Sequence, residues 1–308
     1  MAKFLKKYLL GDNEEKPLPS TRKGQILSII KEYYASLILM SVFTFVFALP
    51  VFIVLYIMSY NLQLIDTNDY NQIFYTMFYL SLILIVANII LYIGLSGLFS
   101  AIRKMVYNEY STIMDYFMGI KENAKRFALI GLIYGVSLFL LIIDLIYYEN
   151  ISSLQPMINN IVVGIGIIQY FIISIMSMYM MCQQCRYNLS FKDLVINSFK
   201  FTMKNILLNF AIYCLCFALL SFPLLFSGAI QALLFSMLAL FAYSISALLA
   251  YEYCAYIFDL YVNKTMFPII YLKGLKGYSY YKKNETISEW EMVLFYSMIF
   301  NISSKLST

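Results

Sequence analysis

The chain has 308 residues, of which 62% are hydrophobic and 13% are charged. Soluble domains average about 45–50% apolar and about 25% charged residues, so this composition excludes an ordinary soluble domain. The sequence contains no histidine, which excludes histidine-dependent nucleophile pairs and most zinc sites. The net charge of +5 is explained without a nucleic-acid partner, because basic residues are typical of the cytoplasmic side of membrane proteins.

Six apolar stretches are long enough to cross the roughly 30 Å hydrocarbon core as helices. We therefore predict an all-α, polytopic membrane protein whose membrane domain covers residues 34–258. Residues 1–33 form a cytoplasmic segment with an amphipathic helix, and residues 259–308 form a cytoplasmic tail. The predicted spans are about 34–59, 74–100, 127–147, 157–182, 205–225 and 229–258.

The positions of lysine and arginine indicate the orientation of these spans. All 22 basic residues fall within 1–33, 101–126, 183–204 and 259–308. The loops predicted on the opposite side, at about 60–73, 148–156 and 226–228, contain none. The positive-inside rule therefore predicts a multi-pass protein with both termini in the cytoplasm.

The segment VYNEYSTIMDYFMGIKENAKR, residues 106–126, has a helical period. Thr112 is followed three residues later by Asp115, which is capping-box spacing and predicts a helix start near residue 112. We expect an amphipathic helix that lies along the inner leaflet and leads into the third span. The residues that share its predicted apolar face are Val106, Tyr110, Ile113, Met114, Phe117, Ile120 and Ala124.

Two further segments have a similar pattern. Residues 189–205 repeat the cap spacing with Ser190 and Asp193, and residues 20–34 form a looser copy before the first span. One interpretation is a duplicated unit, in which an inner-surface helix precedes a membrane hairpin. The other is that any six-span protein with basic inner loops has such a period, and the sequence leaves both open.

Polar residues on these helices are the candidate partner-binding site. They are Glu109, Asp115, Lys121, Asn123, Lys125, Asp193, Lys200 and Lys204. A second group lies within the predicted spans, where polar residues are functional candidates by default. This group comprises Asn88, Asp144, Gln169, Asn209 and Glu252. Interhelical hydrogen bonds worth roughly 0.6–2 kcal/mol also account for the three amides, and interfacial positions account for the two acids.

Small residues and cysteines add two further expectations. Gly131 and Gly135 form a GxxxG pair, which predicts close packing of helices. Cys182 and Cys185 have redox or metal spacing, but no second ligand pair accompanies them. We expect no catalytic residue, metal or cofactor.

One stretch of the chain carries a family likeness. It comprises Gly97, Ala101, Arg103, Val106, Glu109, Asp115, Phe117, Ile120, Lys121, Asn123 and Lys125. In order and spacing these residues resemble the YesL-like family of bacterial integral membrane proteins. The chain departs from that pattern where Ser96 and Gly97 replace a Gly-Pro-like pair and where Tyr116 follows Asp115. The resemblance implies a bacterial cytoplasmic-membrane protein, often associated by genome context with sugar ABC transporters, and it supplies no catalytic residue.

These observations favour a non-enzymatic accessory or scaffold protein that works with a transport system, for which a sugar ABC transporter is the candidate. The expected partners are the lipid bilayer and either transporter subunits or further copies of the chain, and no nucleic acid. The alternative is a small-solute transporter or exporter in its own right, with the five polar residues of the spans along its path.

Overall fold

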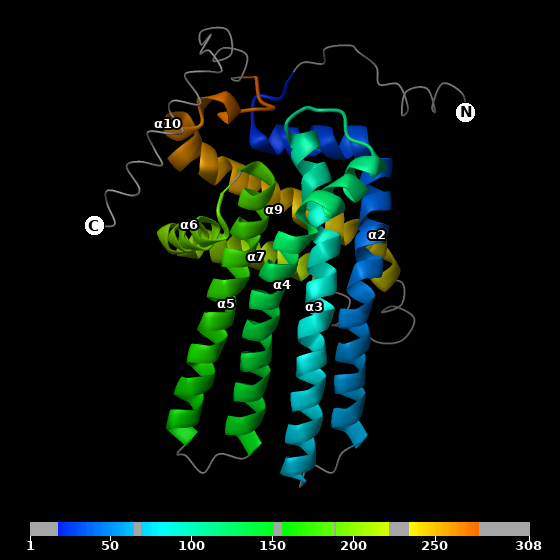
Figure 1. Cartoon of the computed structure of the whole chain (residues 1–308), viewed down its shortest axis with the longest axis vertical. Helices are drawn as coiled ribbons and strands as arrows, with labels where there is room; N and C mark the ends of the chain where they lie inside the picture. The colour runs from blue at the N-terminus through cyan, green and yellow to red at the C-terminus, as the bar shows by residue number, and fades with distance from the viewer. Residues whose placement is uncertain (1–17, 65–68, 151–155, 188, 222–233, 277–308) are drawn as a thin grey trace.

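The structure, a computed structural model, describes residues 18–64, 69–150, 156–187, 189–221 and 234–276. Four long helices run side by side along its length (Figure 1). They are α2 (Arg22–Leu64), α3 (Tyr70–Val106), α4 (Ile113–Asn150) and α5 (Pro156–Arg186). Together with the helical run Leu234–Met266, five helices of the described part are long and apolar enough to cross a membrane. The described part of the chain is therefore helical, without strands, and of the multi-pass membrane type.

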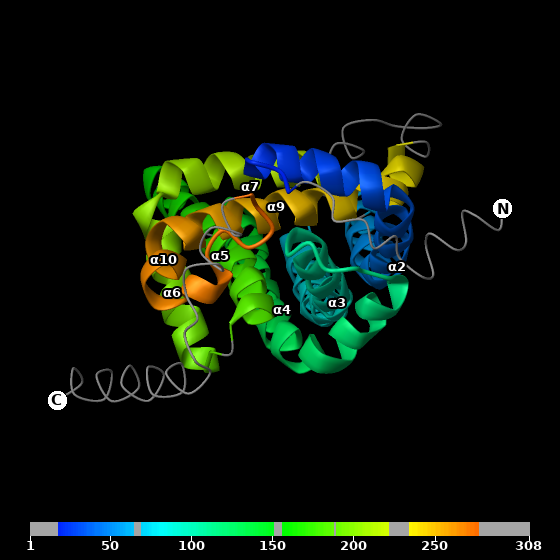
Figure 2. The same cartoon turned by 90° about the horizontal axis from the view of Figure 1, so that it is seen from above.

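The other elements gather at one end of the four long helices, which we call the crossing end. Both α6 (Phe191–Lys204) and α7 (Ile206–Ser221) lie across the direction of the long helices there (Figures 1 and 2). The predicted fifth span, 205–225, corresponds to the 16 residues of α7 and to residues that lie outside the described part. The count of six spans therefore stays a prediction.

The run Leu234–Met266 crosses the long helices obliquely (Figures 1 and 2). Its last part extends beyond residue 258, where the membrane domain was predicted to end. The run contains the π-helical turn η2 (Leu238–Ala242), α9 (Tyr243–Phe258), a second π-helical turn η3 (Asp259–Asn263) and α10 (Lys264–Met266), and a 3-10 turn, η4 (Pro268–Ile270), follows it.

The first eleven residues of α2, 22–32, form a separate arm at the crossing end. Tyr33 has φ −112° and ψ 18°, outside the helical range, so the axis bends there (Figure 1). The Thr21 hydroxyl accepts a hydrogen bond from the Gly24 N–H at 3.1 Å, which satisfies one free donor at the helix start. The arm therefore lies across the bundle before α2 turns along it.

The predicted helix starts at 112 and 190 are confirmed. The Thr112 N–H donates to Asp115 Oδ2 at 2.7 Å, and α4 begins at the next residue. The Asp193 N–H donates to Ser190 Oγ at 3.2 Å, and α6 begins at Phe191. However, Val106 is the last residue of α3, and a connection separates it from α4. The apolar face predicted from residue 106 onward therefore begins only at α4.

Glycines allow α3 and α4 to pack closely. A Cβ at Gly97 would lie 2.6 Å from Tyr116 O, and one at Gly119 would lie 2.4 Å from Ser100 Cβ. Gly131 and Gly135 also face α3, since added Cβ atoms would lie 2.8 Å from Tyr92 Cβ and 3.1 Å from Ile85 Cα. The close packing predicted from the GxxxG pair is confirmed.

Replacing Gly97 with alanine should destabilise the protein, because the new methyl group would meet a backbone oxygen of α4. Overpacking of this kind costs about 1–3 kcal/mol. The matched control is Gly164→Ala on α5, where nothing lies within 4 Å of an added Cβ. Unfolding of the detergent-solubilised protein should show a loss for Gly97→Ala and none for Gly164→Ala; equal effects would contradict the packing described.

Candidate functional site

Four charged side chains meet inside the crossing end, and we call them the charged layer. Arg22, from the arm of α2, donates hydrogen bonds to Glu252 Oε2 at 3.3 Å and to Asp259 Oδ2. Arg186, at the end of α5, donates to Asp259 Oδ1 at 3.2 Å. The side chains of Arg186, Glu252 and Asp259 are 1%, 2% and 6% exposed. Two arginines and two carboxyl groups thus lie together in a mostly buried site.

The helical run 234–266 brings both acids to the same site. Glu252 and Asp259 are seven residues apart, about two turns, so they share one face. The π-helical turn η3 begins at Asp259, and such turns often occur at functional positions. Asn263 donates to Asp259 Oδ1 at 2.5 Å and accepts from the Tyr187 hydroxyl at 2.6 Å. The layer is thus extended by neutral hydrogen bonds.

Aromatic rings surround the guanidinium of Arg186. Its Cζ lies 5.5 Å from the centroid of the Tyr107 ring, 5.9 Å from that of Phe258 and 6.0 Å from that of Tyr187. Its Nε and Nη1 have no hydrogen-bond partner among the residues described. Cation–π attraction to the rings compensates part of this deficit.

Basic and amide side chains also bind backbone carbonyls at the crossing end. Arg103 donates to Cys185 O at 2.9 Å, and Arg126 donates to Leu189 O at 2.8 Å. Gln25 donates to Val106 O, the last carbonyl of α3, at 2.5 Å. The last carbonyls of a helix lack partners within it and carry partial negative charge, so Arg103 and Gln25 stabilise the ends of α5 and α3, whereas Arg126 binds the connection between α5 and α6.

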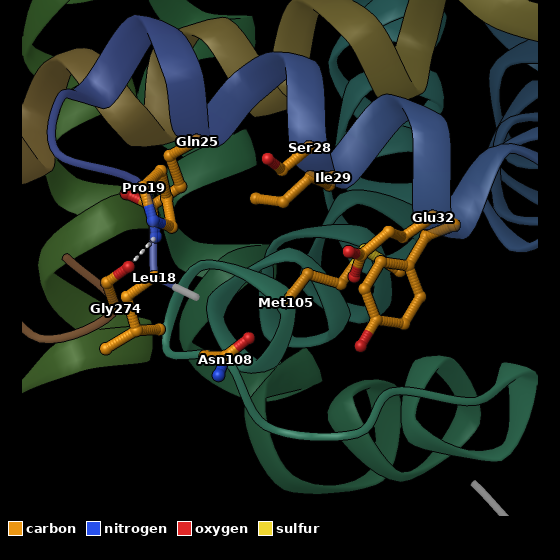
Figure 3. Close-up of a pocket in the computed structure, with 10 residues that line it drawn as sticks. Leu18, Pro19, Gln25, Ser28, Ile29, Glu32, Met105, Asn108 and Gly274 are labelled. Atoms are coloured by element: carbon orange, nitrogen blue, oxygen red, sulfur yellow. Dashed lines mark hydrogen bonds between the residues drawn. The ribbon is translucent and has the colours of Figure 1, made fainter. Parts of the chain in front are cut away.

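A cavity of about 30 Å³ opens beside the arm (Figure 3). Gln25 and Gly274 lie at one end of it, and the Gln25 amide donates to Gly274 O at 3.3 Å. Glu32 and Asn108 line it farther along (Figure 3). This volume accommodates one or two water molecules, whereas small-molecule sites measure about 300–1,000 Å³.

Three of the candidate partner-binding residues make contacts within the chain. Glu109 pairs with Lys273 at 2.8 Å. Asp115 pairs with Lys104 at 2.5 Å in addition to its helix cap. Asn123 donates to the Ser100 hydroxyl at 3.2 Å and accepts from the Gln184 amide at 3.0 Å. Asp115 and Asn123, on the first turns of α4, therefore point toward the protein.

The other five candidates are exposed. Asp193 accepts a hydrogen bond from Ser190 at the start of α6. The Nζ of Lys204 lies 3.6 Å from the centroid of the Tyr261 ring. The remaining three are Lys121, Lys125 and Lys200. The exposed part of the predicted partner-binding site thus consists mostly of lysines.

Among the polar residues of the predicted spans, Asn209 has the most complete environment. Its Oδ1 accepts hydrogen bonds from the hydroxyls of Tyr179 and Tyr253, both at 2.6 Å. Its Nδ2 donates to Phe201 O at 3.0 Å and to Thr202 O at 2.9 Å. This one side chain therefore connects α5, α6, α7 and α9.

The other four polar residues of the predicted spans form no hydrogen bond with Asn209 in the described part. Asn88 donates to Leu84 O of its own helix at 2.8 Å. Gln169 is exposed, and Asp144 lies half-buried against Gly166 of α5. Only Glu252 belongs to the charged layer. The five candidates thus share no hydrogen-bond partner within the described part.

Sequence reasoning missed three of the four members of the charged layer: Arg22, Arg186 and Asp259. Each lies outside the predicted spans, where a charge is assumed to meet water. The spacing of seven residues between Glu252 and Asp259 was the one available signal, because it places two acids on one helix face. In the part of the chain that the structure describes, no group of three or more Cys, Asp or Glu residues could hold a metal ion.

Replacing Arg22 with methionine should destabilise the protein by about 3–5 kcal/mol, because the buried carboxylate of Glu252 then has no ion-pair partner in the described part, whereas Asp259 keeps Arg186. The double variant Arg22→Met/Glu252→Leu removes both charges of that pair and should recover a large part of the loss. The matched control is Lys23→Met, which changes the neighbouring exposed residue of the arm and should alter stability by less than about 0.5 kcal/mol. Unfolding in detergent measures all three, and additive effects in the double variant would refute the pairing.

Comparison with known proteins identifies no relative: no family model matches the chain, and no curated protein or solved structure is similar to it. The resemblance of residues 97–126 to the YesL-like family stays a prediction.

Proposed function

We propose that the chain is a non-enzymatic accessory or scaffold protein of the bacterial cytoplasmic membrane, with six spans and both termini in the cytoplasm. The observation that carries this proposal is that several of its polar side chains hold its own helices together. Asn209, Asn123 and Asp259 each bind two or more other elements of the chain. A transporter needs polar groups that stay available to a moving solute, whereas a scaffold needs a rigid bundle.

Two observations support the proposed orientation. The arginines that define the basic side in the sequence all lie at the crossing end, where α3 and α5 end and α2 and α4 begin. From the crossing end the long helices extend as apolar stretches, and many of their large apolar side chains are exposed. Such a surface suits contact with lipid or with the helices of a partner. The positive-inside rule then assigns the crossing end to the cytoplasmic side.

The proposed partner is a transport system, and the resemblance to the YesL-like family makes a sugar ABC transporter the candidate. Self-association is the other form of partnership that the exposed apolar faces allow. In both cases the contact would form through side chains of the long helices that face away from the core. Val86 on α3 and Ile168 on α5 are 57% and 61% exposed, so they are suitable probes.

A photoreactive residue at Val86 or at Ile168 should form a covalent adduct with another protein in cells. The matched control is Leu84, which is 1% exposed and should give only products within the chain. The mass and peptide content of the adduct identify either a transporter subunit or a second copy of the chain. No protein adduct from any exposed position, together with a lone monomer in mild detergent, would refute the scaffold.

The alternative function, transport of a small solute, predicts a different experimental result. If the purified protein alone carried out solute flux in proteoliposomes, and flux ceased when the five polar residues of the spans were replaced, transport would be the function. The five residues are Asn88, Asp144, Gln169, Asn209 and Glu252. We expect no such flux.

A further inference from the structure

The helix α6 exposes an unusual mixture of side chains. Leu194, Ser198 and Thr202 are buried against the bundle. The opposite side carries lysines between large apolar residues, and these side chains are exposed within the described part. The exposed members are Lys192, Ile196, Phe199, Lys200, Met203 and Lys204.

The first turns of α4 expose the same mixture. Tyr116 and Phe127 are fully buried, and Asn123 binds neighbouring helices. On the outer side, apolar residues come first and lysines follow one or two turns later. The exposed members are Met114, Phe117, Met118, Lys121 and Lys125, with one acid, Glu122, beside the lysines. We call the exposed sides of α4 and α6 the lysine faces.

Both lysine faces lie at the level where the long apolar helices reach the crossing end. α6 lies across the long helices, and the first turns of α4 curve around the bundle toward α2 (Figures 1 and 2). Immediately after α6, Leu207 is 84% exposed. A helix lying at the headgroup level of a bilayer has this composition, with apolar side chains in the acyl region and lysine stems extending to the polar surface.

Charge determines which headgroups fit. Within the described part, Lys121, Lys125, Lys192 and Lys200 form no ion pair. Three acids lie on α6 and the first turns of α4: Asp115 already pairs with Lys104, Asp193 caps α6, and Glu122 is exposed and forms no ion pair within the described part. The exposed lysines therefore outnumber the exposed acids on both helices. Lysine is a compact point charge that binds phosphate well. An anionic surface is therefore complementary to both faces.

We propose that the lysine faces bind the headgroups of anionic phospholipids in the leaflet at the crossing end. The apolar residues of each face enter the acyl region, and the ammonium groups contact lipid phosphates. This inference relies on the proposed membrane placement of the crossing end but not on any protein partner. It differs from general membrane solvation because it predicts a preference for headgroup charge that resides in named lysines.

The test is a lipid titration of the purified full-length protein in uncharged detergent, followed by thermal unfolding. Phosphatidylglycerol, which is anionic, should stabilise the protein at lower concentration than phosphatidylcholine, which is zwitterionic. The variant carries Lys121→Gln, Lys125→Gln, Lys200→Gln and Lys204→Gln. One lysine near an anionic membrane surface strengthens binding about fivefold, or by about 1 kcal/mol. The preference for phosphatidylglycerol should therefore be at least about tenfold weaker in this variant.

The matched control replaces the same four lysines with arginine, which keeps the charge and should keep the preference. Equal responses of the native protein to both lipids would overturn the proposal, as would an unchanged preference in the glutamine variant. If the glutamine variant lost only the capture of a protein partner, the faces would be a protein-docking surface and the proposal would also be wrong. Because the titration uses the purified chain alone, its outcome is independent of whether the proposed scaffold has a partner.

Discussion

A charge taken out of water must be paired, and this requirement organises the crossing end. Arg22 and Arg186 reach the same carboxylate, Asp259, from two helices that are far apart in the sequence. Glu252 adds a second anion to Arg22. Breaking a buried pair costs several kcal/mol, because the remaining charge stays without water or partner. The arm of α2, the end of α5 and the oblique run 234–266 are therefore held in one arrangement.

The arginines of this chain and the lysines of α6 have separate roles. All four arginines make contacts inside the crossing end, with carboxylates or with backbone carbonyls. Arginine is weakly hydrated and has five donors in a fixed plane, which suits such sites. The lysines of α6 remain exposed instead, beside apolar residues. The positive charge at the crossing end thus joins the helices on the inside, and on the outside we propose that it binds lipid phosphates.

Local features of the fold could be predicted from the sequence, and long-range contacts could not. The apolar runs indicated the long helices, and the caps at Thr112 and Ser190 marked helix starts, because both signals depend on neighbouring residues. The polar faces of the helices that follow these caps were expected to bind a partner. Asn123 instead turns toward Ser100 and Gln184 of the same chain. Likewise, Arg22 and Glu252 are 230 residues apart. No periodicity in a single sequence indicates that pairing.

The central claim is that the charged layer fastens the arm, residues 22–32, to the oblique helical run. Amide hydrogen exchange of the arm in lipid nanodiscs tests it most directly, with the native protein compared with Asp259→Asn. This substitution keeps the shape of the side chain but removes the charge that both arginines share. We expect a protected arm in the native protein and exchange at least about tenfold faster in the variant, with the amides of α3 unchanged. Equal exchange of the arm in the two proteins would contradict the claim.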